Sequence, residues 1–341
     1  MKHSPRLASN GPLRLLGLVS LLCLPVFAGR PLPDATPASP PSPSPPIRAE
    51  AERVVVPVTV TGADGEVVRG LRQADFKLFV DGKEVRDFLF LDDQDAPATV
   101  GVLIDRSSVA VGRQVPWIRS FLEGFFHRTD RKDSLFMATY GLEWEVIVPA
   151  TSDRSALMGA IYNLDPVMFR DAKTKWVGTP GETRSYSPFN RGFPPNKTAI
   201  ALDRALYELA RAQTPRKAIL LVSDGDENLS KVTLNHIQYF GVPVYTLYAE
   251  GSGFGERSLF RRGAMVKRLS LESGGARVTA GEGANPVDAG KGVADLVRNQ
   301  YLVSFVPDES LKRSKTHQVL VRHAREDITL SYRRSFRFVR E

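Results

Sequence analysis

Hydrophobic and polar residues alternate near both ends of the chain, and this alternation predicts short β-strands. Arg53–Thr61, Phe76–Val80 and Val85–Phe90 carry apolar residues at roughly every second position, with Gly and Asp turn residues between them. Three similar segments follow near the C-terminus, at Tyr301–Val306, Gln318–Arg322 and Ile328–Tyr332. Three short strands are too few to be stable alone. We therefore expect all six to meet in one small β-sandwich-like unit.

In the centre of the chain, apolar strands alternate with amphipathic helices. Thr99–Asp105 and Ala218–Asp224 are nearly continuous aliphatic runs, which is typical of strands buried on both faces. Pro116 suits the first turn of a helix whose apolar face runs from Ile118 to Phe126. Further strands are predicted at 135–140, 145–149, 242–248 and 276–279, and further helices at 154–164, 199–212, 234–240, 259–272 and 287–299. This order predicts a Rossmann-like α/β domain with a doubly wound, mostly parallel sheet in the strand order 3-2-1-4-5-6.

The first 50 residues differ from the rest. Basic residues precede the apolar stretch Leu15–Ala28, which predicts a signal peptide over 1–28 and an exported, periplasmic or extracellular protein. A stretch of about 14 apolar residues is short for a bilayer span, so we expect no transmembrane span in the mature chain, with an uncleaved anchor as the alternative. Residues 29–50 are rich in proline and predict a disordered linker. The expected organisation after the linker is an N-terminal β segment at 51–96, the α/β domain at 97–299, and a C-terminal β segment at 300–341 that packs with 51–96.

Cysteine and charge narrow the possible functions. Cys23, inside the apolar leader, is the only cysteine, so a mature chain contains no disulfide, thiolate metal site or cysteine nucleophile. The formal net charge is +8, and basic residues are frequent near the C-terminus. For an exported protein, this favours an acidic partner or an anionic cell-envelope surface over nucleic acid. Solvated strand faces are the simpler explanation of the same residues.

Two of the predicted strands end on a carboxylate. Asp105 and Asp224 end the two aliphatic strands, and Ser107 and Thr198 supply hydroxyl groups nearby in the predicted topology. In the expected strand order these two strands are neighbours at the switch point, where ligands collect beyond the carboxyl ends. Carboxylate and hydroxyl oxygens suit a hard cation such as Mg²⁺. The sequence therefore predicts an oxygen-lined metal site at this edge of the sheet.

The segments Asp105-Arg-Ser107, Thr198 and Ser223-Asp224-Gly225 resemble the metal-ion-dependent adhesion site of von Willebrand factor type A domains. Flanking segments are similar to the exported von Willebrand factor A-related proteins of acidobacteria, over residues 54–338; they are Val56–Val60, Leu71–Gly82 and Tyr332–Arg334. The resemblance implies a von Willebrand factor A-like fold and a non-enzymatic, adhesion-type module. It also implies Mg²⁺, Mn²⁺ or Ca²⁺ at Asp105, Ser107, Thr198 and Asp224, and a protein ligand whose acidic side chain completes the metal coordination.

The chain departs from that family pattern at one position. The pattern is Asp-x-Ser-x-Ser, and Val109 stands where the second serine is expected. A valine side chain cannot bind a metal, so either water fills its place or the affinity falls. Ser108 is adjacent, but its side chain would need a local backbone shift to take over. A metal-free structural or assembly scaffold with a relic site is therefore an alternative, and a metal-dependent hydrolase is a weaker one.

A long segment at 166–197 interrupts the α/β pattern. It is rich in Gly, Pro, Ser and Arg and carries several aromatic residues. Long loops in compact domains tend to be functional or disordered. We expect this insert to emerge beside the two aspartates and to select the protein ligand, with plain disorder as the alternative.

Overall fold

The computed structural model describes residues 53–92, 95–141, 143–166, 197–225, 231–250, 256–281, 283, 285–308, 310–311 and 315–337. The predicted signal peptide and linker, and nearly all of the predicted insert at 166–197, lie outside the described residues. None of the helices in the described ranges is both long and apolar enough to span a bilayer.

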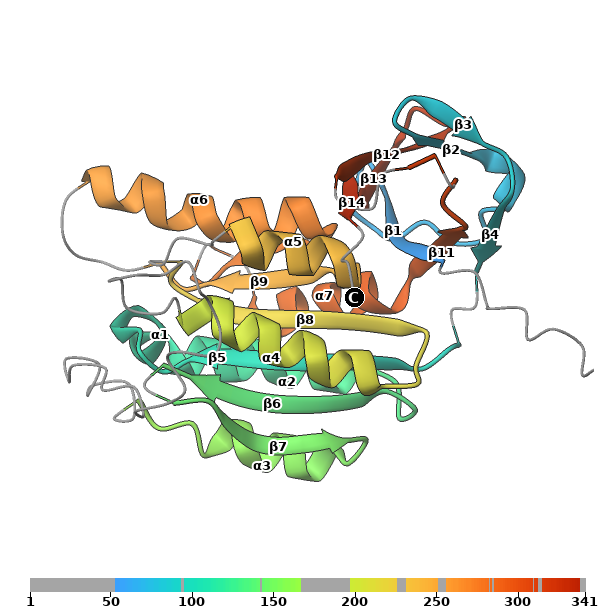
Figure 1. The fold of residues 1–341 in the computed structure, drawn as a ribbon. Coiled ribbons are helices and arrows are strands. Elements are labelled where there is room, and N and C mark those ends of the chain that lie inside the picture. The colour runs from blue at the N-terminus through green and yellow to red at the C-terminus, as the bar shows by residue number, and fades with distance from the viewer. Residues whose placement is uncertain are drawn as a thin grey trace, which may run out of the picture. The chain divides into compact units, whose positions relative to one another are not determined.

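A six-stranded sheet forms the centre of the α/β domain (Figure 1). Its strand order is β10 (Arg277–Thr279), β9 (Val244–Tyr248), β8 (Arg216–Ser223), β5 (Ala98–Asp105), β6 (Ser134–Tyr140) and β7 (Glu145–Thr151). All neighbours pair in parallel except β6 and β7. The predicted order 3-2-1-4-5-6 is therefore confirmed, with β5 and β8 side by side at the switch point.

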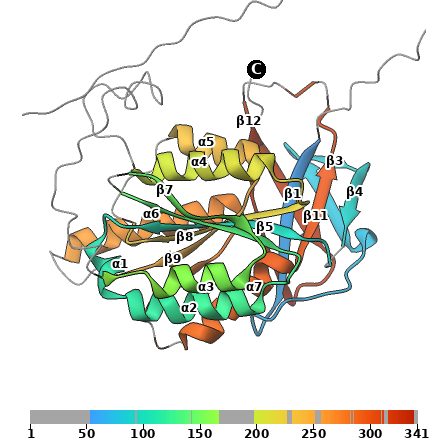
Figure 2. The same cartoon turned by 90° about the horizontal axis from the view of Figure 1, so that it is seen from below.

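Helices cover both faces of this sheet (Figure 2). On one face lie α2 (Val115–Arg128), α3 (Arg154–Tyr162) and α7 (Pro286–Arg298), and on the other lie α4 (Lys197–Arg211), α5 (Lys231–Phe240) and α6 (Glu256–Ser273). Each layer of helices has its own apolar core against the sheet. Because both faces are covered, every residue of β5 is buried, which explains its continuous aliphatic sequence. The short helix α1 (Val109–Arg113), which follows β5, was not predicted.

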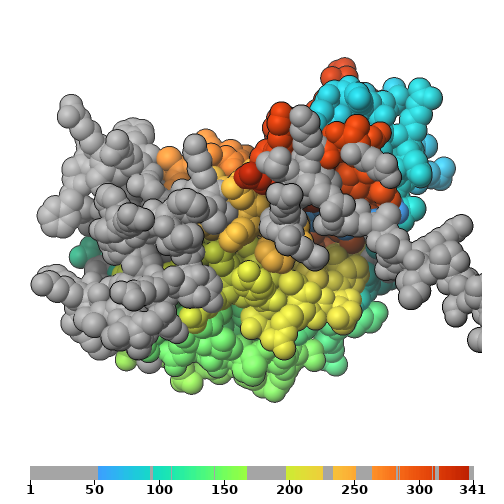
Figure 3. All heavy atoms as spheres, in the orientation of Figure 1, coloured from blue at the N-terminus to red at the C-terminus, as the bar shows by residue number. Residues whose placement is uncertain are grey.

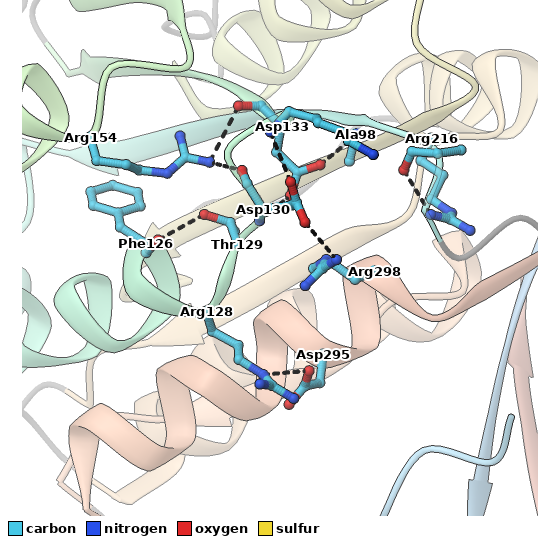
Figure 4. Close-up of polar contacts among 12 residues, drawn as sticks. Ala98, Phe126, Arg128, Thr129, Asp130, Asp133, Arg154, Arg216, Asp295 and Arg298 are labelled. Carbon is cyan, nitrogen blue, oxygen red and sulfur yellow. Dashed lines mark hydrogen bonds and ion pairs between the residues drawn. The ribbon is translucent and has the colours of Figure 1, made fainter.

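A polar cluster holds the amino ends of β5 and β6 (Figure 4). The buried Asp133 carboxylate accepts hydrogen bonds from the backbone N–H groups of Ala98 and Asp130, both at 2.8 Å. Arg154 donates to the backbone carbonyls of Asp130 and Asp133, and Arg298 lies 3.2 Å from the Asp130 carboxylate. The charged side chains of this cluster therefore hold the loop before β6 against β5, α3 and α7. The cluster is therefore structural, and it lies at the opposite end of the strands from Asp105.

Strands from both terminal segments share two further sheets. One has the order β13 (Ile328–Tyr332), β1 (Val54–Gly62), β11 (Gln300–Phe305) and β4 (Phe88–Leu91). The other has the order β14 (Ser335–Arg337), β12 (Thr316–His323), β2 (Phe76–Val80) and β3 (Lys83–Val85), with the 3₁₀ turn Gln73–Asp75 before β2. The two sheets share one apolar core. In Figure 3 the cyan residues of the N-terminal β segment lie beside the red and orange residues of the C-terminal β segment. We call these eight strands the β unit.

The prediction of one strand at Val85–Phe90 was wrong. The chain leaves β3 after Val85 and begins β4 at Phe88, and the two strands belong to different sheets. Two consecutive polar residues, Arg86 and Asp87, mark the corner between the two strands. The three-residue strand β14 was also missed, because so short a segment has little periodicity.

Arg333 connects the β unit to the α/β domain. Its guanidinium is buried and donates to the backbone carbonyls of Gln238 at the end of α5 and Val55 in β1. Burial lowers the pKa of Arg333 to about 10. Gln300 also donates to the Tyr245 hydroxyl of β9 at 2.9 Å. Because the one buried guanidinium donates to backbone carbonyls of both parts, Arg333 fixes the β unit on the helices.

Two glycines of α7 allow a direct comparison of close helix packing. A Cβ atom added to Gly290 would lie 2.0 Å from the Phe121 carbonyl oxygen of α2, whereas one added to Gly292 would meet nothing within 4 Å. We expect Gly290→Ala to lower the free energy of unfolding by about 2 kcal/mol or more, because the two helices must separate. Gly292→Ala should raise it by about 0.5 kcal/mol through helix propensity. Urea unfolding measures both, and equal effects would contradict the close packing of α2 on α7.

Candidate metal-binding site

The parallel pairing of β5 with β8 brings the two predicted carboxylates to one edge of the sheet. Ile104 pairs with Val222, so Asp105 ends β5 level with the end of β8, and Asp224 follows one residue after β8. Asp105 is buried and Asp224 is half-buried. The two loops that follow these strands therefore start side by side, as the sequence predicted.

Asp105 organises the first loop. Its Oδ1 accepts hydrogen bonds from the Ser107 hydroxyl at 2.6 Å and from the Ser107 backbone N–H at 2.9 Å. A serine that donates its proton to a carboxylate keeps its oxygen lone pairs available to a cation. Ser107 therefore retains the chemistry of a metal ligand while its proton is held by Asp105.

Ser108 links the first loop to the second, and the sequence prediction missed this. Its hydroxyl donates to Asp224 Oδ2 at 2.8 Å and accepts the backbone N–H of Val111 at 3.1 Å, so it caps the N-terminus of α1. The Ser108 side chain is thus directed at Asp224, and its role in place of the missing serine stays a prediction. The sequence signal for the cap is a serine directly before an apolar segment, because serine is a preferred residue at the start of a helix. No such signal indicates the contact with Asp224.

Ser223 provides a second connection between the loops. Its hydroxyl lies 3.5 Å from Asp105 Oδ2, at the outer limit of a hydrogen bond, and accepts the Gly225 backbone N–H at 3.1 Å. Gly225 has a positive φ of 63°, which favours glycine where the chain turns after β8. Ser223 therefore belongs both to the turn after β8 and to the candidate site.

Thr198 lies on the neighbouring helix. It is buried, and its hydroxyl is 3.4 Å from the Tyr140 hydroxyl at the end of β6, the strand that pairs with β5. The helix predicted at 199–212 begins two residues earlier, because α4 starts at Lys197. The backbone of Thr198 therefore belongs to the first turn of α4. Its role as a metal ligand stays a prediction.

The donor set is suited to a hard cation. Two carboxylates and three hydroxyls, from Asp105, Asp224, Ser107, Ser108 and Ser223, are connected by the contacts described above. In the described residues, no group of three or more His, Cys, Asp or Glu side chains could hold a metal. A cation here would therefore depend on hydroxyl and water oxygens as well as the two carboxylates, which Mg²⁺ accepts. The residues fit such an ion.

An ion pair joins α4 and α5, two neighbouring helices on the same face of the sheet. His236 of α5 lies 2.9 Å from Asp203 of α4. The hydrogen bond to Asp203 raises the pKa of His236 above its ordinary value, although partial burial acts in the opposite direction. The charge of His236 thereby contributes to holding α4, which carries Thr198, against α5.

Comparisons with known proteins give remote structural likenesses. No protein-family model matches the sequence, and no curated protein matches it. An aerotolerance-related membrane protein from Bacteroides fragilis shares 14% identity, covering 59% of this chain and 98% of its own, with a TM-score of 0.41. Manganese-loaded Plasmodium vivax TRAP protein shares 14% identity, covering 73% and 96%, with a TM-score of 0.38. Proximal thread matrix protein 1 from the mussel byssus shares 13% identity, covering 64% and 51%, with a TM-score of 0.41. The architecture of this chain is established by its own strand order.

Replacement of either loop serine tests the connection between the loops. Ser108→Ala removes both the cap of α1 and the hydrogen bond to Asp224, so we expect the free energy of unfolding to fall by about 2 to 3 kcal/mol. Ser107→Ala should cost about 1 kcal/mol, since the backbone N–H still donates to Asp105. Urea unfolding without divalent metal measures both. A smaller loss for Ser108→Ala than for Ser107→Ala would contradict the described geometry.

The His236–Asp203 pair should make stability depend on pH. Because the pKa of His236 is raised in the folded protein, its contribution is complete below the unfolded value of about 6.5 and is lost as pH rises through the folded pKa. We therefore expect the urea midpoint of the wild type to fall as the pH is raised from about 5 to about 9. In His236→Gln this contribution to the fall should be absent. His127→Gln, at an exposed position on α2, is the matched control. Identical pH profiles for the wild type and His236→Gln would disprove the contribution.

Proposed function

We propose that this chain is an exported, adhesion-type module that binds a protein ligand through a divalent metal at the Asp105–Asp224 site. The observation that supports this most is the pair of serine–aspartate hydrogen bonds, Ser107 to Asp105 and Ser108 to Asp224, in adjacent loops. The resemblance to von Willebrand factor A domains supports the same role. The proposed location is periplasmic or extracellular, with association to the cell envelope, and it depends on the predicted signal peptide.

The site residues have separate roles in this proposal. Ser107 and Ser108 would offer hydroxyl oxygens, Thr198 would offer a third, and Asp105 and Asp224 would supply the negative charge that retains the ion. Mg²⁺, or Mn²⁺ or Ca²⁺, would supply positive charge to which an acidic side chain of the partner can bind. Ser108 would compensate for Val109, because it contacts Asp224 from the position directly before the missing serine. No residue is assigned a catalytic role, and we propose that the module is not an enzyme.

A second candidate is a metal-free scaffold. The carboxylates of Asp105 and Asp224 both accept hydroxyl hydrogen bonds, so their oxygens have protein donors without a cation. A site satisfied in this way can persist as a structural connection between β5 and β8 after metal binding has been lost. A hydrolase has no comparable support, and a panel of phosphoester and peptide substrates tests it.

Calorimetry with Mn²⁺ and Mg²⁺ tests the metal site. Asp224→Asn keeps the shape of the side chain and an acceptor for Ser108 but removes the charge, so we expect Mn²⁺ affinity to fall by at least about tenfold. Asp288→Asn, on the exposed first turn of α7, is the control and should leave affinity unchanged. Absence of Mn²⁺ binding by the wild type, or equal loss in both variants, would reject the metal site and favour the scaffold.

Partner capture tests the adhesion role separately. Immobilised protein should retain a partner from an envelope extract in Mg²⁺ and release it on chelation, and the Asp224→Asn variant should retain less. Capture that is insensitive to chelation would favour the scaffold.

A further inference from the structure

The outer face of the second sheet of the β unit carries two cations beside two apolar side chains. In the pairing of β2 with β12, Lys77 stands opposite Arg322 and Phe79 stands opposite Leu320. The alternate residues, such as Leu78 and Val321, are buried in the core, so these four side chains point outward. We call Lys77, Phe79, Leu320 and Arg322 the cationic sheet face.

The positions of Lys77 and Arg322 are electrostatically unfavourable. Like charges directly opposite each other on neighbouring strands repel and destabilise the pairing. In the described part of the chain, neither Lys77 nor Arg322 forms an ion pair with a carboxylate. The Arg322 guanidinium instead lies 5.3 Å from the centre of the Phe79 ring, which holds it beside Lys77. An external anion would remove the repulsion between the two cations.

The apolar pair is exposed enough to take part in a contact. Leu320 is 39% exposed, and Phe79 is half-buried beside it. Glu84, opposite Phe79 on β3, is the nearest acidic position in the strand pairing, and its carboxylate lies 3.3 Å from Arg86. The face therefore combines a net positive charge with apolar side chains, which is the pattern of surfaces that bind at membrane interfaces.

We propose that the cationic sheet face binds an anionic lipid bilayer. Lys77 and Arg322 contact lipid phosphates, and Leu320 and Phe79 contact the apolar part of the headgroup region. A bilayer fits better than an extended acidic peptide, because the two cations and the two apolar side chains form a patch across two paired strands rather than a row along one strand. An extended peptide presents its contacts along a single line. This proposal is independent of the metal site.

Co-sedimentation of the full chain with vesicles tests the proposal. Vesicles with about one quarter phosphatidylglycerol should bind the wild type, and pure phosphatidylcholine vesicles should bind it less. The double variant Lys77→Gln/Arg322→Gln should lose roughly 25-fold in affinity for the anionic vesicles, about fivefold for each cation. Binding should weaken at about 1 M salt, where the Debye length is about 3 Å, and should not respond to chelation.

The matched control is Arg131→Gln/Lys132→Gln, which removes the same charge from an exposed loop of the α/β domain. It should bind like the wild type. Because both variants keep the same N-terminal segment, the difference between their vesicle affinities measures the contribution of the cationic sheet face. Equal losses in both variants, or no preference for anionic vesicles, would overturn the proposal. Binding of polyglutamate but not of vesicles, abolished by Lys77→Gln/Arg322→Gln, would also overturn it and indicate an acidic protein partner. Thermal melting checks that both variants remain folded.

Discussion

The parallel pairing of β5 with β8 is the constraint on which the candidate site depends. The two strands are parallel, start level and have the same length of 8 residues, so they also end level and the residues after them meet at one edge of the sheet. Asp105 and Asp224, more than a hundred positions apart in the sequence, are connected there through Ser108 and Ser223. Burial of β5 on both faces holds that register, since a slip of one residue would place the aliphatic side chains differently against both helix layers.

The site consists of carboxylates whose acceptors are matched by hydroxyl donors. This has two consequences with opposite meaning for function. The serine oxygens remain capable of binding a cation because they donate rather than accept in their contacts with aspartate. The same contacts give the aspartates protein donors when no cation is bound. Ser108 has a further structural duty as the cap of α1, which links the shape of the site to the start of that helix.

The two ends of the central strands are used differently. At the amino ends, Asp130 and Asp133 are held by Arg154, Arg298 and backbone donors, and this polar cluster fixes the strands. At the carboxyl ends, the loops carry the candidate metal-binding residues. Arg333 joins the β unit to α5 through two backbone carbonyls, so strands from both chain ends are tied to the helical layer. The cationic sheet face lies on the second sheet of that unit and shares no residue with the metal-binding site.

The sequence by itself determined the order of strands and helices in the α/β domain and the positions of Asp105 and Asp224, because buried strands and amphipathic helices leave strong periodic patterns. It also indicated that the β-strands near both termini belong together. Only the tertiary structure decided that Val85–Phe90 turns a corner between two sheets, and that Ser108 reaches Asp224. It also placed Arg333 in a buried joint. These features depend on contacts between residues far apart in the chain. The periodicity of apolar residues indicates which face of a strand is buried, but it does not indicate which distant residues that face will contact.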